Sequence, residues 1–288
     1  MQESSPNDKD GDGVGSKDDG KMNTDEKVTT EKEKERKKIK PVEVPKEVAW
    51  GAKHEDFLMW QLKLEDELKE KLKTRTKTIP WTRPQGKVST IRPFLSSTFR
   101  DFNDERNLFF KNSCPKLEKI CWSRGVQFVP LDLRWGVTKE ESATGFVIKL
   151  CNEEIDRSRP YFVCSLGLDY RDRSVTEIEI QHGALRKPNC RCYFYFRTVE
   201  YLMKVDADKR SVFVDYGANA VKLARLKHAI VDAGFGVKWF NSPQEMVDLM
   251  HEDMRVLIDR DCEAQTTPTP LERYTLSTLR FATSTLSM

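Results

Sequence analysis

Five short apolar segments, each followed by a polar turn or a helical pattern, most restrict how this chain can fold. They span residues 91–95, 126–131, 161–166, 192–196 and 236–240. Segment 161–166 is apolar on both faces, which is typical of a strand buried in the middle of a parallel sheet. Right-handed crossovers between such strands give a doubly wound sheet with helices on both faces. We therefore expect an α/β domain built on a five-stranded parallel sheet.

The chain divides into four parts by composition. Residues 1–53 form a charged tail and connector, which we expect to be disordered because it has too little apolar surface to bury. Residues 54–89 hold an amphipathic helix and a basic linker. The α/β domain is expected at 90–262, and 263–288 is a Ser/Thr-rich tail. The amphipathic helix either packs on the domain or pairs with a partner helix.

Composition excludes several classes of function. The net charge is only +3, with basic and acidic residues nearly balanced, so a nucleic-acid-binding face is not indicated. The seven cysteines lie mostly within apolar segments, as in reduced intracellular proteins. Cys190 and Cys192 have no second pair nearby, so we predict no metal site. No segment is apolar enough to cross a membrane and the N-terminus lacks a signal-peptide core, so we expect a cytoplasmic protein without a membrane partner.

The turn after the first predicted strand carries three hydroxyl side chains, Ser96, Ser97 and Thr98, directly before a helix. Hydroxyls and backbone N–H groups at such a place suit a phosphate, for which Arg100 and Arg106 would supply positive charge. Ordinary helix capping explains the same hydroxyls, so both interpretations stay open. The chain has no G-x-x-x-x-G-K-[ST] phosphate loop, and no G-x-G-x-x-G follows the first strand.

Two further turns add polar and aromatic side chains at the same predicted sheet edge. Asp132, Arg134 and Trp135 follow the second strand, where Asp132 and Arg134 are able to pair. The stretch after Trp135 is long enough for a lid or a docking loop. Gly167 and Tyr170 follow the third strand. Because the carboxyl ends of parallel strands share one edge, all these turns form one candidate ligand site.

Four acidic side chains lie near predicted helix starts. Asp101 and Glu105 are interpreted as complements to a helix dipole. Ser174 and Glu177 have the spacing of a capping box. Glu179 comes two positions after Glu177, so the two carboxylates should point in different directions. Glu179 either lies on the surface in solvent or projects toward the sheet edge.

Several separated motifs together carry a family resemblance. They are FLSSTFRD at 94–101, ER at 105–106, DLRWGVT at 132–138, LG at 166–167 and SVTE at 174–177. These motifs resemble an N-terminal domain of unknown function that precedes the NACHT NTPase in nephrocystin-3, telomerase- and vault-associated proteins and NACHT/WD-repeat proteins. The resemblance covers about residues 90–260 and implies a Toll/interleukin-1-receptor-like (TIR-like) fold of flavodoxin type. The relatives continue into an NTPase and a repeat array, whereas this chain ends first, as a short isoform or a fragment would.

The resemblance leads to two functional hypotheses. The preferred one is an intracellular, non-catalytic interaction or scaffold module that associates with itself or with a protein partner. It would dock through the loop after Trp135 and an exposed helix face.

The alternative is an NAD glycohydrolase, with NAD as substrate and no certain cofactor. Glu179 falls where NAD-cleaving TIR domains keep their catalytic glutamate, whose carboxylate would stabilise an oxocarbenium-like ribose. The chain departs from that pattern. Those enzymes usually carry Trp and Cys four and three residues before the glutamate, where this chain has Val175 and Thr176.

Overall fold

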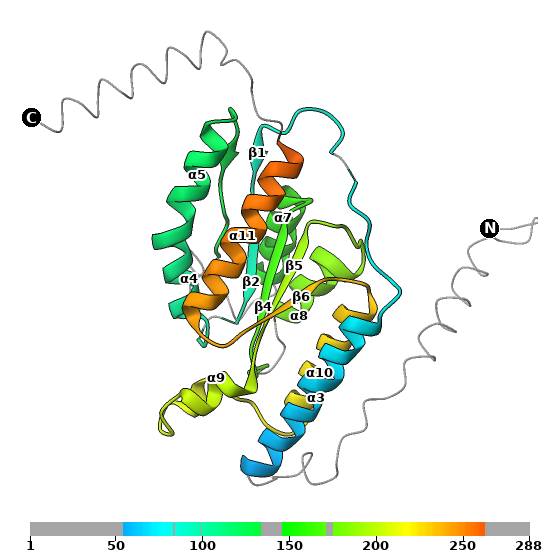
Figure 1. The fold of residues 1–288 in the computed structure, drawn as a ribbon, viewed down its shortest axis with the longest axis vertical. Coiled ribbons are helices and arrows are strands. Elements are labelled where there is room, and N and C mark those ends of the chain that lie inside the picture. The colour runs from blue at the N-terminus through cyan, green and yellow to red at the C-terminus, as the bar shows by residue number, and fades with distance from the viewer. Residues whose placement is uncertain (1–53, 83, 99, 134–145, 171–174, 263–288) are drawn as a thin grey trace, which may run out of the picture. The chain divides into compact units, whose positions relative to one another are not determined.

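The computed structural model describes residues 54–82, 84–98, 100–133, 146–170 and 175–262. Within these ranges every strand pairing is parallel. The strands are β1 (Thr90–Ile91), β2 (Phe94–Ser97), β3 (Gln127–Phe128), β4 (Phe162–Leu166), β5 (Cys192–Arg197) and β6 (Val237–Phe240). A four-stranded sheet has the order β2-β4-β5-β6, and β1 pairs with β3. The predicted α/β fold with a parallel sheet is confirmed (Figure 1).

Two backbone hydrogen bonds of Leu131, at Pro93 and Leu95, join the two sheets. Leu131 N donates to Pro93 O and Leu95 N donates to Leu131 O, both at 2.9 Å. Pro93 has no N–H to complete the ladder, and it separates β1 from β2. If β1 and β2 are taken as one interrupted strand, the order of the five predicted strands is 2-1-3-4-5. This is the flavodoxin-type order.

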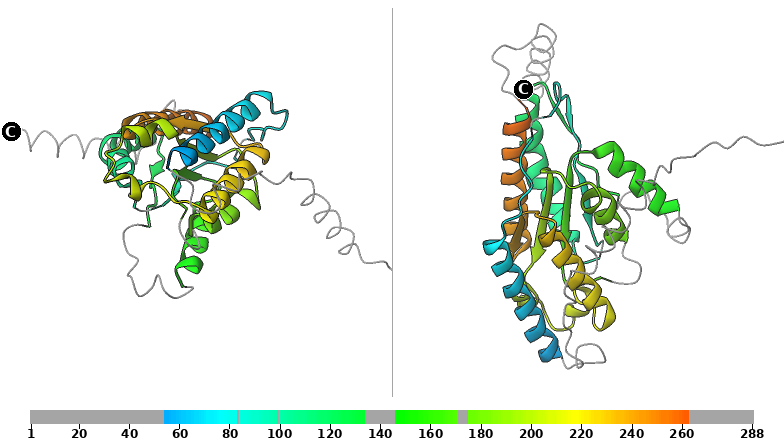
Figure 2. Two further views of the ribbon diagram at one scale, coloured as in Figure 1. Left: turned by 90° about the horizontal axis from the view of Figure 1, so that it is seen from below. Right: turned by 90° about the vertical axis from the view of Figure 1, so that its right-hand side faces the viewer.

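Helices cover both faces of the sheet, as Figure 2 shows. One face carries α4 (Asn103–Leu108), a π-helical turn (Phe109–Ser113), α5 (Cys114–Trp122) and α11 (Pro243–Asp261). The other face carries α7 (Phe146–Ser158), α8 (Val175–Ile180) with a second π-helical turn (Gln181–Leu185), and α10 (Ala218–Asp232). The helical geometry changes near Pro115: the first π-helical turn ends at Ser113, directly before α5, and Pro115 lies in the first turn of α5.

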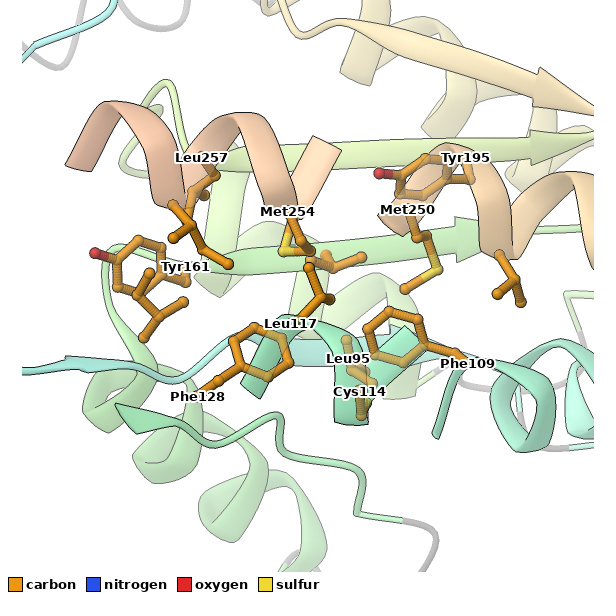
Figure 3. Close-up of a cluster of buried hydrophobic side chains, with 14 of the residues drawn as sticks. Leu95, Phe109, Cys114, Leu117, Phe128, Tyr161, Tyr195, Met250, Met254 and Leu257 are labelled. Atoms are coloured by element: carbon orange, nitrogen blue, oxygen red, sulfur yellow. The ribbon is translucent and has the colours of Figure 1, made fainter. Parts of the chain in front are cut away.

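Alternate residues of each central strand point into different cores. Leu95, Val163 and Tyr195 pack with α5 and α11, and Figure 3 shows part of this cluster around Phe109, Leu117, Met250 and Met254. Their neighbours in the strands, Phe94, Phe162 and Phe194, pack on the opposite side. All five residues of β4 are buried, as expected for a strand covered on both faces.

The predicted amphipathic helix is α3 (His54–Thr74), and it packs on the domain. Phe57, Trp60, Leu64 and Leu68 form its buried stripe against α10 and the short helix α9 (Val199–Lys204). Val237 and Trp239 of the edge strand β6 contact the same cluster, so α3 helps to cover that edge of the sheet. The sequence reasoning did not predict α9 or the 3-10 turn Arg210–Val212. None of the described helices is long and apolar enough to cross a membrane.

Candidate functional site

The carboxyl ends of β2, β4 and β5 meet at one edge, as the sequence predicted for the turns that follow them (Figure 1). Ser97 of β2 is in register with Ser165 of β4. A Cβ atom added to Gly167 would lie 2.6 Å from Asp101 Oδ2 and 2.8 Å from an Arg197 nitrogen. The first and third turns are therefore in direct contact, and any larger residue at position 167 would displace the Asp101 carboxylate or the Arg197 guanidinium.

Glu179 lies inside the protein at this edge. Glu179 is only 5% exposed, and Ser96 Oγ donates a hydrogen bond to Glu179 Oε2 at 2.6 Å. The interpretation of Glu179 as a solvated surface side chain is wrong, and projection toward the sheet is correct. Burial raises the pKa of Glu179, although hydrogen bonds from Ser96 and Cys151 act in the opposite direction.

The burial of Glu179 follows from the spacing of small residues along its helix. Gly183, four positions later, lies so close to the Phe162 ring that a Cβ atom there would be 2.5 Å from it. Thr176, Glu179, Gly183 and Ala184 are all buried and share this inward face. Small residues at this helical spacing are a signal in the sequence that could have placed Glu179 on the inner face.

Arg106 forms a buried ion pair with Asp132. Its Nη1 donates to Asp132 Oδ1 at 2.6 Å and its Nη2 donates to Leu95 O at 2.9 Å, and both side chains are buried. Arg106 therefore joins the first helix to the second turn. Arg134, the partner that the sequence allowed for Asp132, lies outside the described residues. Arg100, the other predicted phosphate partner, is exposed.

Arg197 was missed by the sequence reasoning, although it ends an apolar strand. It is 1% exposed, and its guanidinium donates to Asp101 Oδ2 at 2.6 Å and to Glu105 Oε1 at 2.9 Å. Burial opposes its charge, but the two carboxylates outweigh burial and raise the pKa of Arg197. Asp101 and Glu105 therefore bind a buried cation, a role that the sequence did not indicate. Glu105 also lies in the first turn of α4, as a complement to the helix dipole would.

The guanidinium of Arg197 is also enclosed by aromatic rings. Its central carbon lies 4.0 Å from the ring centroid of Phe102 and 4.7 Å from that of Tyr201. Phe213 and Phe240 lie at 5.1 and 5.7 Å. Cation–π attraction in this dry setting adds to the two ion pairs.

The three hydroxyls of the first turn do not cap α4. Ser96 binds Glu179, Ser97 donates to Thr98 O at 3.1 Å, and Thr98 donates to Asp101. The N-cap residue of α4 is Phe102, which makes no side-chain cap hydrogen bond. The capping interpretation is therefore wrong. Ser96 and Thr98 instead link the end of strand β2 to two acidic side chains, Glu179 and Asp101.

Tyr170 lies at the same edge and is buried. Its hydroxyl donates to Glu177, and the Lys222 ammonium lies 5.6 Å from its ring centroid. Burial raises the pKa of Tyr170. The two acids of α8 thus bind different partners, Glu177 with Tyr170 and Glu179 with Ser96, as their spacing indicated.

Some predicted features fall outside the described residues. They are Arg134, Trp135 and the loop up to residue 145, and Ser174 of the capping box. Among the residues that are described, no group of three or more His, Cys, Asp or Glu side chains is arranged to hold a metal ion.

The chain forms an α/β domain with a parallel sheet of flavodoxin-type strand order. Buried ion pairs join the segments that lie at the carboxyl edge of this sheet. The chain belongs to the family described as domain of unknown function (DUF4062), whose model matches residues 92–255. Helix α3 precedes the matched segment. No solved structure matches the chain.

Three relatives place this family in long proteins. A TPR repeat-containing protein of Dictyostelium discoideum is 27% identical over 204 residues, covering 59% of this chain and 12% of that protein. Tetratricopeptide repeat protein 41 of Rattus norvegicus is 26% identical, covering 59% of this chain and 18% of that protein. Telomerase protein component 1 of Mus musculus is 30% identical over 176 residues, covering 50% of this chain and 7% of that protein. The chain thus spans less than a fifth of each of these relatives.

Proposed function

We propose that this domain is an intracellular, non-catalytic interaction module of TIR-like type, belonging to the NACHT-associated class of signalling proteins. It associates with a protein partner or with a second copy of itself. The flavodoxin-type strand order agrees with the TIR-like fold. The family domain makes up a small share of long relatives, two of which are named for tetratricopeptide repeats. Such repeats build extended binding surfaces, a setting that suits a further interaction module.

The observation that carries the proposal is that two arginine side chains at the carboxyl edge are buried and bind carboxylates of the same domain. Arg106 and Arg197 are both buried and both bound to carboxylates of this domain. Their contacts hold the turns of the edge in fixed positions. A fixed frame of this kind suits the presentation of a surface to a partner, because little ordering is needed on binding.

Several large apolar side chains on the described surface offer contact points. Trp122 at the end of α5 is 59% exposed, and Met203 of α9 is 47% exposed. Single exposed apolar residues are common, so each must be tested separately.

The test is self-association of the full chain. Light scattering across a concentration series and chemical crosslinking should show a dimer or a larger species. Trp122→Ser or Met203→Ser should weaken association if its surface is used, with no change in the unfolding midpoint. Exposed Lys116→Ser on α5 serves as the matched control. A chain that stays monomeric at every concentration and forms no crosslinks with co-purified protein contradicts the proposal.

The enzymatic alternative depends on Glu179. A carboxyl group buried at the carboxyl edge with a raised pKa is the kind of perturbed group that active sites use. Incubation with NAD and detection of released nicotinamide tests this function, with Glu179→Gln as the variant. Release that stops in Glu179→Gln while the fold is kept supports an enzyme. Release that is unchanged by the substitution excludes this role for Glu179.

A further inference from the structure

Helix α3 is attached to the domain through an apolar cluster of its own. Its buried apolar side chains pack with α9, α10 and β6, and among the described residues none of them belongs to the two clusters on the faces of the sheet. Figure 1 shows α3 lying along α10. Because neither sheet core contains an apolar side chain of α3, this helix can leave the domain without opening either of them.

The contact between α3 and α10 encloses the imidazole of His228. Only 7% of this side chain is exposed, and its Nε2 atom has no hydrogen-bond partner in the part of the chain that the structure describes. Across the contact, Glu67 Oε1 of α3 lies 3.8 Å from Nε2, which is beyond hydrogen-bonding distance. A buried polar atom without a partner costs free energy, because its hydrogen bond to water is lost and not replaced. His228 therefore disfavours the α3 contact even in its neutral form.

A proton on His228 would place a charge inside this contact. Burial lowers the pKa of His228, and the Lys71 ammonium of α3 acts in the same direction. Glu67 and Asp232 oppose the shift, but Glu67 is 64% exposed and Asp232 already binds Lys71 at 2.5 Å. Lys227, the preceding residue of α10, is also buried, at 2% exposure. The docked state therefore favours the neutral imidazole over the charged form.

We propose that α3 detaches from the domain in acid and that His228 is the group that senses the proton. A charged imidazole is costly in the docked position, whereas release of α3 leaves the same imidazole in water. Acid therefore shifts the equilibrium toward the released helix. Release uncovers the apolar stripe of α3 and the edge strand β6, which α3 helps to cover in the docked state.

The pH interval of the release follows from the direction of the shift. Since the pKa of His228 is lowered from 6.5 in the docked state, its contribution to docking is fully present above pH 6.5 and is lost as the pH falls through the folded pKa. One proton changes the equilibrium constant for release by up to about tenfold per pH unit in this interval. Lys227 titrates higher, because burial lowers its pKa only to about 8.

The test is amide hydrogen exchange of the full chain at pH 7 and pH 5.5, expressed as protection factors that remove the intrinsic pH dependence of exchange. A released α3 loses protection, because a helix of 21 residues is only marginally stable alone. We expect the protection of α3 to fall by up to about tenfold at pH 5.5, while the protection of β4 stays unchanged.

Two variants separate His228 from other titrating groups. His228→Gln is neutral at both pH values and should keep the protection of α3, and His228→Leu gives the same comparison should the first variant fail to fold. His182→Gln is the matched control, because its ring nitrogen lies 2.9 Å from Asp156 Oδ1 of α7. This control should respond as the wild type does.

Three results would overturn the proposal. They are an unchanged protection of α3 in the wild type, an equal loss in a folded variant without His228, and a loss that is as large in β4 as in α3. The last result would mean that acid unfolds the whole domain and does not release the helix.

Discussion

Gly167 and Asp101 are in such close contact that a Cβ atom on Gly167 would lie 2.6 Å from Asp101 Oδ2. This contact joins the turn after β4 to the turn after β2. Arg197, at the end of β5, donates a hydrogen bond to Asp101. The arrangement explains why a glycine directly follows the apolar strand β4, and it gives a first prediction.

Gly167→Ala should destabilise the domain by about 3 kcal/mol, because the methyl group displaces Asp101 from its buried ion pair. Denaturant unfolding measures the change. Gly236→Ala is the matched control, since no atom lies within 4 Å of its added Cβ. Equal stabilities for the two variants would contradict the close approach of these turns.

Arg106→Met should destabilise the domain by about 3–5 kcal/mol, because it leaves the buried Asp132 carboxylate without the guanidinium. Arg100→Met, at the exposed arginine just before α4, should change the free energy of unfolding by less than about 0.5 kcal/mol. Chemical denaturation of both variants measures the two changes in the free energy of unfolding. A small effect at Arg106 would mean that the pair does not hold the second turn.

Leu68→Ala should destabilise the domain by about 2–5 kcal/mol, since Leu68 is fully buried where α3 meets the domain. Met59→Ala lies on the same helix at a site that is 56% exposed and should change stability by less than about 0.5 kcal/mol. Thermal or urea unfolding of the full chain gives both values. If Leu68→Ala has no effect, α3 is not part of the cooperative unit.

Glu179→Gln should be more stable than the wild type at pH 7. Burial raises the folded pKa of Glu179 above its usual value near 4.5, so the contribution of this group is fully present below that value and is lost as the pH rises through the folded pKa. The advantage of the variant should therefore shrink as the pH is lowered toward 4.5. Urea unfolding from pH 4.5 to 8 tests this, with Glu153→Gln on the exposed side of α7 as control.

Lys227→Met should remove one pH-dependent part of stability. The folded pKa of Lys227 is lowered from 10.5 to about 8, so its contribution is present above 10.5 and is lost as the pH falls through about 8. The stability of the wild type relative to Lys227→Met should therefore rise between pH 7 and 9.5. Because all other titrating groups are shared, the difference between the two unfolding curves isolates this lysine. A flat difference would show that Lys227 is solvated.

Most of the helices and strands, and the edge at which the site lies, could be predicted from the sequence, whereas α9 and the 3-10 turn could not. Apolar runs such as 161–166 mark buried strands because a strand covered on both faces has no polar side to show. Parallel strands with right-handed crossovers then bring the turns after β2 and β4 to one edge, whatever the turns contain. The stripe of Phe57, Trp60, Leu64 and Leu68 likewise fixed the buried face of α3, because helical periodicity records which side meets a core.

The partners of the polar residues at that edge follow from the three-dimensional fold and could not be predicted from the sequence. Ser96 with Glu179, Arg106 with Asp132, and Arg197 with Asp101 are separated by 83, 26 and 96 residues. The residue type alone does not show whether a charged side chain is buried or solvated. What separates them is whether a partner of opposite charge arrives from another element to offset the loss of water, and that depends on the path of the whole chain.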